Sequence, residues 1–338
     1  MAGSWIDQNK ILPGAYINIK TNAPLSITVG DRGIVVLLQR LEVGEVGRIY
    51  KVTALESELP EEADKKLVNE ALKGAVEVLV YNLGKEGLLE TALSRLKTVD
   101  FNVIAFPNST SEEKASIIDW IEEMRENEGV KIVGVLANKE ANKEFIINVV
   151  QGIQLSDNTI LTVEEVTSYV AGITAGANIN KSNNGLKYIG AIDAIPRMTK
   201  TEMEAAIKAG KFIFKVDNAQ NVTSVYDINS LTTFDDEKGK TFSKNRVIRA
   251  LDSINNDIVN IFESNYIGKV NNNVDGRSWL RATLVEYFNE LQRLSAIQNF
   301  TAEDVEVLEG KEKDSVVINC NIQTVDSVEK MYITVNLS

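Results

Sequence analysis

The chain has 338 residues, 44% of them hydrophobic and 25% charged, with a formal net charge of −12. These values are typical of a soluble globular protein with two or three domains, and the acidic balance argues against sequence-independent binding to nucleic-acid phosphates, which requires clustered Lys and Arg. The sequence contains no histidine, which removes Ser–His–Asp and Cys–His catalysis and histidine-based metal sites together.

The single cysteine, Cys320, leaves no internal disulfide possible. We expect it to be a buried small hydrophobe, because it lies in the alternating run Val316–Ile322. The start of the chain lacks the basic residues and apolar run of a signal peptide, and the longest apolar run, Ile34–Leu38, is far too short to span a bilayer.

The first predicted element is an extended strand at Ala15–Lys20, where polar and apolar residues alternate between Pro13-Gly14 and Pro24. A strand without a partner in its own chain is marginal, and its free backbone groups invite pairing with another chain. Residues 30–81 then predict a small β-rich domain with one helix. Its expected strands are Gly33–Leu38 and Val76–Tyr81, and its expected helix is Pro60–Leu72.

From Gly87 onward helices and strands alternate. Short, continuous apolar strands separated by helices favour a mainly parallel sheet covered on both faces, over roughly residues 84–233. Ser109 or Thr110 is the expected N-cap of one helix, because acidic residues follow in its first turn. The expected helices are Leu88–Leu96, Ser111–Asn127, Thr162–Ala177 and Thr199–Ala209, and the expected strands are Phe101–Phe106, Val130–Leu136, Phe145–Val150, Tyr188–Ala194 and Lys211–Val216.

Residues 244–297 predict two long amphipathic helices joined by an Asn- and Gly-rich turn. Apolar residues recur at three- and four-residue steps from Val247 to Phe262 and again from Leu280 to Ile297, so each set shares one helix face. We therefore predict an αα-hairpin as the scaffold of the C-terminal third. The expected strands after it are Val305–Leu308, Val316–Ile322 and Met331–Leu337.

Three segments superficially suggest chemistry. Gly172–Ser182 resembles a phosphate loop, but no Gly directly precedes Lys181 and the preceding segment is helical, so a close-packed helix followed by a loop is favoured. Asp235-Asp236-Glu237 lacks metal-ligand spacing and is interpreted as a solvated loop. Asp193 follows a predicted strand, where catalytic acids often lie, yet it has no partner base or nucleophile, so a loop cap is favoured.

Four basic residues border the predicted hairpin in this acidic protein: Arg246, Arg249, Arg277 and Arg281. One interpretation is that they lie on solvated helix faces. The other is that they form a cationic patch for an acidic protein partner.

The shared order of several short segments resembles one known family, the sheath proteins of contractile tails, found in myophages, defective prophage particles and R-type bacteriocins. The resemblance covers nearly the whole chain, which is similar to the compact version of the family, without a large outer insertion. The segments that carry it are Pro13–Asn18, Arg32–Val35, Tyr169–Gly172, Asn180–Ser182, Gly210–Phe214, Ile228–Thr232, Arg246–Arg249, Tyr266–Val270, Asp275–Arg277 and Val325–Tyr332.

The resemblance implies an α+β protein of several domains. These are an N-terminal arm (1–28), a small β-sandwich-like domain (29–83), a non-catalytic α/β domain of subtilisin-like topology (84–238), a C-terminal domain with the helical hairpin (239–329) and a C-terminal arm (330–338). It also implies that both arms pair as strands with neighbouring subunits, and it implies no catalytic residue, cofactor or metal. The implied arm residues are Tyr16, Ile17, Asn18, Ile19, Tyr332, Ile333, Thr334 and Val335.

The implied function is that of a structural subunit of a contractile sheath. Hexameric rings would stack helically around an inner tube and contract from a metastable extended state, driving the tube through the target envelope. The implied partners are further copies of the chain, the inner tail tube protein, and baseplate and tail terminator proteins, without nucleic acid and without direct membrane insertion. The particle would be a virion tail or a bacteriocin, assembled in the bacterial cytoplasm.

By analogy with the family, the C-terminal domain would face the tube, with Arg246, Arg249, Arg277 or Arg281 as candidate contacts. Two other functions stay open at this point. One is a non-contractile shell or adaptor protein that uses the same strand exchange. The other is an α/β hydrolase that uses Asp193 or the region of Ser182.

Overall fold

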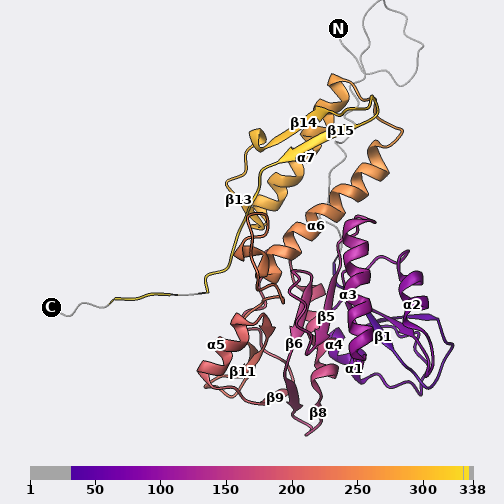
Figure 1. Ribbon diagram of the computed structural model, residues 1–338, viewed down its shortest axis with the longest axis vertical. Coiled ribbons are helices and arrows are strands. Elements are labelled where there is room, and N and C mark those ends of the chain that lie inside the picture. The colour runs from indigo at the N-terminus through magenta and orange to yellow at the C-terminus, as the bar shows by residue number, and fades with distance from the viewer. Residues whose placement is uncertain (1–31, 330, 335–338) are drawn as a thin grey trace, which may run out of the picture.

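A computed structural model of the protein describes residues 32–329 and 331–334. Its centre is a seven-stranded sheet of order β10-β6-β5-β4-β1-β3-β2 (Figure 1). Every neighbouring pair is parallel except β2 and β3, which confirms the predicted mainly parallel sheet. The strands are β1 (Ile34–Gln39), β2 (Ile49–Thr53), β3 (Glu77–Asn82), β4 (Val103–Ala105), β5 (Val133–Ala137), β6 (Ile146–Val149) and β10 (Lys211–Phe212).

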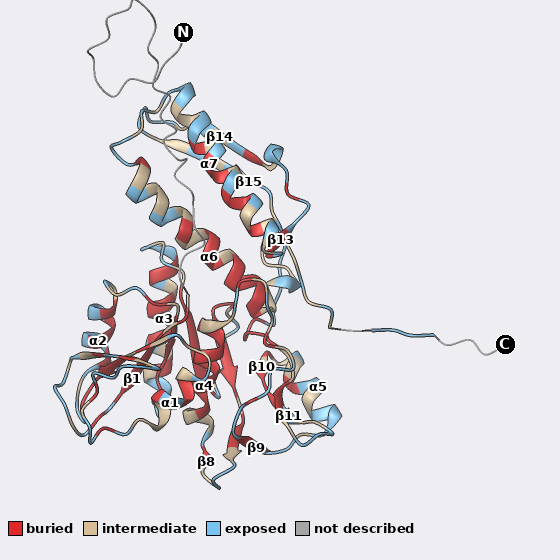
Figure 2. Ribbon diagram, turned by 180° about the vertical axis from the view of Figure 1, so that it is seen from behind, coloured by how far each residue is buried: buried red, intermediate tan, exposed pale blue. Residues whose placement is uncertain are grey.

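Helices cover both faces of this sheet, as its continuous apolar strands require. In β1, Val35 and Leu37 belong to one core cluster, whereas Val36 and Leu38 belong to the other. Figure 2 shows the strands as the most buried part of the molecule. The first cluster is covered by α1 (Lys66–Leu72) and α4 (Val163–Gly176), and the second by α2 (Leu89–Leu96) and α3 (Ser111–Glu126).

The separate β-sandwich-like domain predicted for residues 29–83 is wrong. β1 lies between β3 and β4 in the central sheet, where Val35 is level with Val78 on one side and Val103 on the other. The strands on both sides of the predicted boundary at residue 84 therefore share one sheet. The predicted helix at Pro60–Leu72 is also too long: a turn in which the Ala63 amide donates to the Pro60 carbonyl precedes α1.

The capping pattern of α3 is confirmed. The Thr110 hydroxyl accepts from the Glu113 amide at 3.2 Å, and the Glu113 carboxylate accepts from the Thr110 amide at 2.8 Å. This reciprocal pair satisfies two backbone donors that the first turn leaves free. Thr162 with Glu165 and Thr199 with Glu202 repeat the arrangement at α4 and at α5 (Lys200–Lys208).

Two glycines of α4 allow its backbone to pack directly against the backbone of α1 and of the residues that follow it. A Cβ on Gly172 would collide with the Ala71 carbonyl, and one on Gly176 would collide with the Gly74 carbonyl. This confirms that Gly172–Ser182 begins as a close-packed helix.

We expect Gly172→Ala to lower the free energy of unfolding by about 1–3 kcal/mol, because the two helices must separate to admit the methyl group. Gly239→Ala is the matched control, since open space surrounds that glycine, and it should change stability by less than about 0.5 kcal/mol. Urea titration of both variants measures the difference. Equal stability of the two would contradict the packing argument.

Smaller sheets extend the α/β part. One has the order β8-β7-β9, and another pairs β11 with β12. The predicted strand at Lys211–Val216 is divided, because β10 joins the central sheet while β11 turns to pair with β12. The strands are β7 (Gly152–Leu155), β8 (Ile160–Leu161), β9 (Ala191–Ile195), β11 (Phe214–Val216) and β12 (Val222–Ser224).

The predicted αα-hairpin is confirmed, and its two helices lie side by side above the sheet (Figures 1 and 2). Asn273 caps α7, which starts before the apolar stripe that predicted it. In the part of the chain that the structure describes, no helix is both long and apolar enough to cross a membrane. The elements are η1 (Lys240–Ser243), α6 (Asn245–Ile261), the π-helical turn η2 (Phe262–Tyr266), α7 (Val274–Arg293), β13 (Ile297–Gln298), η3 (Ala302–Asp304), β14 (Val305–Glu309), β15 (Val316–Cys320) and β16 (Gln323–Thr324).

The structure describes part of one of the two predicted terminal strands and none of the other. The predicted strand at Ala15–Lys20, with Tyr16, Ile17, Asn18 and Ile19, lies outside the described residues. Residues 331–334 of the predicted strand at Met331–Leu337 are described and form no strand within the single chain, whereas Val335 and the residues after it are not described.

Candidate assembly site in the C-terminal region

The strands β14 and β15 form a two-stranded antiparallel ribbon beside α7 (Figure 1). Val316, Ile318 and Cys320 of β15 pack against the third core cluster but are only partly buried. Each strand of the ribbon keeps one edge that pairs with no other strand among residues 32–329 and 331–334. Open edges over a partly covered apolar face are a surface to which another strand can add.

A polar clamp fixes the chain just before the C-terminal arm. The Glu329 carboxylate accepts hydrogen bonds from Tyr226 Oη at 2.6 Å, Lys244 Nζ at 2.8 Å and Asn184 Nδ2 at 2.8 Å. Lys244 also pairs with Asp326. Burial by itself would lower the pKa of the Lys244 ammonium, but the hydrogen bonds to Asp326 and Glu329 outweigh burial and raise that pKa above its ordinary value.

Beyond this clamp the described arm residues leave the body of the molecule as an extended segment (Figure 1). Met331, Tyr332 and Ile333 are 76%, 90% and 74% exposed. Large apolar side chains rarely stay this exposed in a row unless another surface covers them. The segment that follows the clamp is therefore apolar and uncovered in the single chain.

A second set of polar contacts joins α6 to the central sheet and its helices. Arg125 of α3 makes a two-pronged ion pair with Asp252 of α6, with both N–O distances at 2.8 Å and both side chains buried. Asn256 accepts from the Lys131 amide and donates to the Lys131 carbonyl, both at 3.0 Å, and Asn255 donates to the Gly129 carbonyl at 2.8 Å. We call these contacts the α6 seam.

Buried polar contacts also hold the first part of α6 in place. The Asp227 carboxylate accepts from Asn245 Nδ2 at 2.8 Å and from the Asn183 amide at 2.9 Å, and it lies 3.5 Å from the Arg249 guanidinium. The half-buried Arg32 donates to Ser253 on α6, and its desolvation together with the charge of Arg249 lowers the pKa of Arg32 to about 10. Two-pronged and buried polar contacts fix both distance and orientation, so these contacts hold α6 in place against the sheet.

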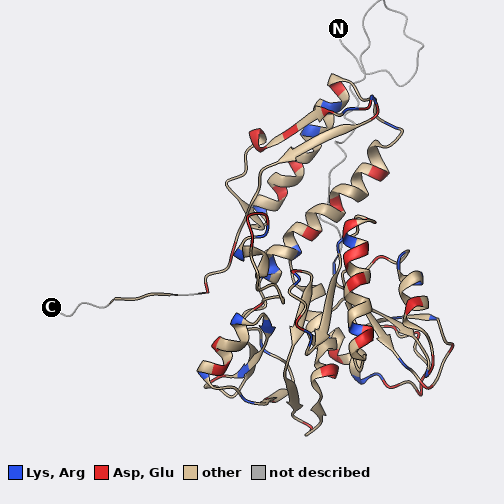
Figure 3. Ribbon diagram, viewed as in Figure 1, with Lys and Arg blue, Asp and Glu red and all other residues tan. Residues whose placement is uncertain are grey.

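The four candidate arginines do not form one patch. Arg246 and Arg249 lie near the start of α6, and Arg277 and Arg281 near the start of α7. Because the hairpin is antiparallel, these sites lie at its opposite ends, and Figure 3 shows acidic and basic positions interspersed between them.

The solvated-face interpretation is wrong for Arg246 and Arg249, which are buried. Arg249 donates to the Lys181 carbonyl at 2.7 Å and to the Thr174 carbonyl at 3.3 Å. The sequence could not reveal this burial, because these partners come from distant segments.

Arg277 and Arg281 are partly exposed and hold the ribbon to α7. Arg277 donates to Asn272 Oδ1 at 3.0 Å and lies 3.4 Å from Glu309. Arg281 donates to the Val305 carbonyl at 2.8 Å. Of the four arginines, these two keep surface that a partner could reach.

The segments that suggested chemistry have structural roles. Asp193 lies within β9 rather than after it, and pairs with Arg197 at 2.6 Å. Asp235 accepts from the amides of Glu237 and Lys238, as a loop residue does. No group of three His, Cys, Asp or Glu side chains that could hold a metal ion occurs in the described ranges. Burial raises the pKa of the half-buried Cys320 thiol, which makes it less reactive.

Sequence reasoning missed the clamp and the α6 seam. The clamp joins Glu329 to Lys244, Tyr226 and Asn184, residues from 85 to 145 positions away along the chain. The only available signal was the charged pair Glu329-Lys330 directly before the uncharged run Met331–Leu337. That signal marks where an arm begins, but it does not identify what holds it.

Two family models match the chain. They are the phage tail sheath protein central domain, at residues 69–230, and the phage tail sheath C-terminal domain, at residues 237–338. The chain is 34% identical over 275 residues to the uncharacterized protein YqbK of Bacillus subtilis strain 168, which covers 79% of this chain and 58% of YqbK. It thus spans little more than half the length of that relative. It is 28% identical to the tail sheath protein of Clostridium phage phiCD119 over 313 residues, or 87% of this chain and 86% of the other.

The fold of the chain also matches solved structures of sheath proteins. The sheath tail protein of Desulfitobacterium hafniense has a TM-score of 0.82 at 30% sequence identity, over 95% of this chain and 99% of the other. The helical sheath of the anti-feeding prophage in its contracted state has a TM-score of 0.73 over 97% of this chain and 99% of the other. At 14% identity, the second likeness concerns the fold alone.

Proposed function

Because the chain belongs to the phage tail sheath family, whose members are structural proteins and not enzymes, we propose that it is the sheath subunit of a contractile tail or of a related injection particle. Hexameric rings of the chain stack helically around an inner tube, and baseplate and tail terminator proteins close the two ends. The observation that carries this proposal is an uncovered apolar arm beyond a fixed clamp, in a chain that also has an open two-stranded ribbon.

The couplings between copies are added strands. The C-terminal arm, with Tyr332, Ile333, Thr334 and Val335, pairs with a ribbon edge of one neighbour. The N-terminal arm, with Tyr16, Ile17, Asn18 and Ile19, pairs with another neighbour. Main-chain hydrogen bonds along an edge give affinity without demanding a particular side chain at every position. The arms thus link the rings.

Contraction is a movement between rigid bodies. The α6 seam and the buried contacts of Asp227 support this view, because they leave no free joint between the sheet and the hairpin. Motion is then confined to the two arms, which act as hinges while the lattice stays connected. A small release of free energy per subunit, repeated along the sheath, drives the tube forward.

Negative-stain microscopy of the purified chain tests the proposal. We expect tubes or stacked rings, because each copy both donates arms and offers ribbon edges. Discrete small particles at every concentration would contradict it. A non-contractile shell or adaptor would also assemble, so co-expression with a tube and baseplate, followed by comparison of sheath lengths, separates that alternative from a contractile sheath. The α/β hydrolase is set aside, because the family is not enzymatic.

The contact with the inner tube is proposed to involve Arg277 or Arg281. We expect Arg277→Glu to reduce co-assembly with the tube by more than it reduces assembly of the sheath alone, because reversal of one charge repels an acidic partner. Arg293→Glu is the matched control, on the same helix and 70% exposed. Pull-down of the tube protein measures both variants, and equal recovery would remove Arg277 from the interface.

A further inference from the structure

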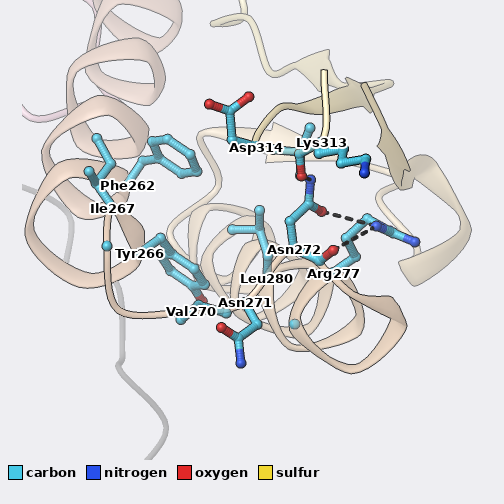
Figure 4. Close-up of a pocket in the computed structure, with 13 residues that line it drawn as sticks. Phe262, Tyr266, Ile267, Val270, Asn271, Asn272, Arg277, Leu280, Lys313 and Asp314 are labelled. Carbon is cyan, nitrogen blue, oxygen red and sulfur yellow. Dashed lines mark hydrogen bonds between the residues drawn. The ribbon is translucent and has the colours of Figure 1, made fainter. Parts of the chain in front are cut away.

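The end of the αα-hairpin at which α6 and α7 connect contains a pocket. It has a volume of about 580 Å³ and lies between the α6–α7 connection and the turn of the ribbon (Figure 4). We propose that this end pocket receives the apolar face of the C-terminal arm of a second copy. The inference rests on the proposed strand exchange and adds the side-chain socket that sets its register.

The pocket has an apolar interior and a polar rim. Phe262, Ile267, Leu280 and Val316 line it, and Arg277 lies at its edge (Figure 4). Ile267 is 57% exposed although it borders this apolar space. Its surface is therefore available to a second chain, and covering it would remove apolar area from water.

The walls of the pocket are held in place before anything binds. Tyr266 stacks on Phe262 with ring centroids 6.2 Å apart, and its hydroxyl donates to Thr283 Oγ1 at 2.7 Å. Asn272 Nδ2 donates to the carbonyls of Lys313 and Ser315 at 2.9 and 2.8 Å, which ties the helix connection to the turn of the ribbon. Such preorganisation reduces the entropy cost of binding.

The C-terminal arm has the composition that this pocket needs. Residues 331–337 read Met-Tyr-Ile-Thr-Val-Asn-Leu and carry no charge, in a chain that is 25% charged. In an extended segment alternate side chains share a face, so the odd-numbered positions present one apolar row. Met331 and Ile333 of this row are 76% and 74% exposed in the single chain.

The position of the pocket matches strand addition to β15. Val316 is both a wall of the pocket and the first residue of β15, and its side chain packs toward the hairpin. A strand added along the free edge of β15 turns one of its two side-chain rows toward the hairpin, over the pocket. The apolar row of the arm is the row that gains from this burial.

The contact joins different surfaces of two copies. The pocket is lined by residues of the connection between α6 and α7. Figure 1 shows this connection at the upper end of the hairpin, whereas residues 331–334 leave near its lower end. A contact between two different patches is heterologous, so each copy is donor to one neighbour and acceptor to another. Such a contact continues from copy to copy and suits a ring or a helical lattice.

A cysteine scan of the full-length chain tests the inference. In a Cys320→Ala background, Ile267→Cys is combined with one cysteine at a time at positions 331 to 337. Oxidation under assembly conditions should give a ladder of covalent multimers at the one odd-numbered position that lies over residue 267. A disulfide requires Cβ atoms within about 4.5 Å, and alternate residues of an extended strand are about 6.8 Å apart. The adjacent even-numbered positions, such as Thr334→Cys, should give little. Leu55→Cys in place of Ile267→Cys is the control acceptor, since Leu55 is 95% exposed and lies outside the pocket.

Several outcomes would overturn the inference. Equal ladders at odd and even positions would mean that the pocket does not set the register. A parallel scan places single cysteines at residues 15–19, and crosslinks of these cysteines to residue 267 would assign the pocket to the N-terminal arm instead. If deletion of residues 331–338 blocks assembly while no position crosslinks to residue 267, the pocket is empty and strand exchange still stands. If the unmodified chain never assembles, the proposed function itself fails.

Discussion

Deletion of residues 331–338 is expected to leave a folded chain that no longer forms tubes. The described part of this arm adds little to the stability of its own subunit, because Met331, Tyr332 and Ile333 are almost fully exposed. The clamp at Glu329 stays intact in this variant. Thermal unfolding should therefore match that of the full chain, whereas electron microscopy and sedimentation should show single subunits or short oligomers.

Deletion of residues 1–20 provides the companion experiment for the other arm. If each arm links a different neighbour, the two truncated chains should fail to form long tubes separately. Normal tubes from either truncated chain would contradict strand exchange at that terminus. A drop in thermal stability would instead mean that the arm packs on its own subunit.

Asp252→Ala is expected to cost about 3–5 kcal/mol of stability, because it leaves the Arg125 guanidinium buried without its partner. The side chains of Arg125 and Asp252 are only 9% and 7% exposed, and both N–O contacts are 2.8 Å. Loss of the pair should also loosen α6 from the sheet. Urea unfolding measures the first effect, and faster hydrogen exchange of α6 amides measures the second.

Glu290→Ala is the matched control for this experiment. Its partner Arg293 is 70% exposed, and exposed pairs contribute little to stability. We therefore expect no measurable change for the control. If Asp252→Ala behaves like the control, the α6 seam does not hold the hairpin to the sheet, and the rigid-body view of contraction loses its support.

The local pattern of the sequence predicted the elements well but misassigned their partners. The continuous apolar run in β1 predicted a strand, which is correct. Nothing in that run indicates whether β4 or only β3 lies beside it, so residues 29–83 were wrongly separated from the main sheet. The αα-hairpin was predicted correctly, because the apolar residues of its two helices follow the helical period over many turns.

The candidate site could be predicted only in outline. The alternation of Tyr332, Ile333 and Thr334 predicted an extended arm. The clamp and the seam depend on contacts between distant residues, such as the pair 127 positions apart that joins Arg125 to Asp252. No periodicity encodes such pairs. The burial of Arg249 was missed for the same reason, since Asp227 comes from another segment.

The most direct test of the account is a cryo-EM reconstruction of the assembled particle. We predict that the β14–β15 ribbon of each copy carries an added strand and that its density continues into a different subunit, through residues 331–338 or through residues 15–20. A reconstruction in which both arms fold back onto their own subunit, with the ribbon still two-stranded, would contradict the account.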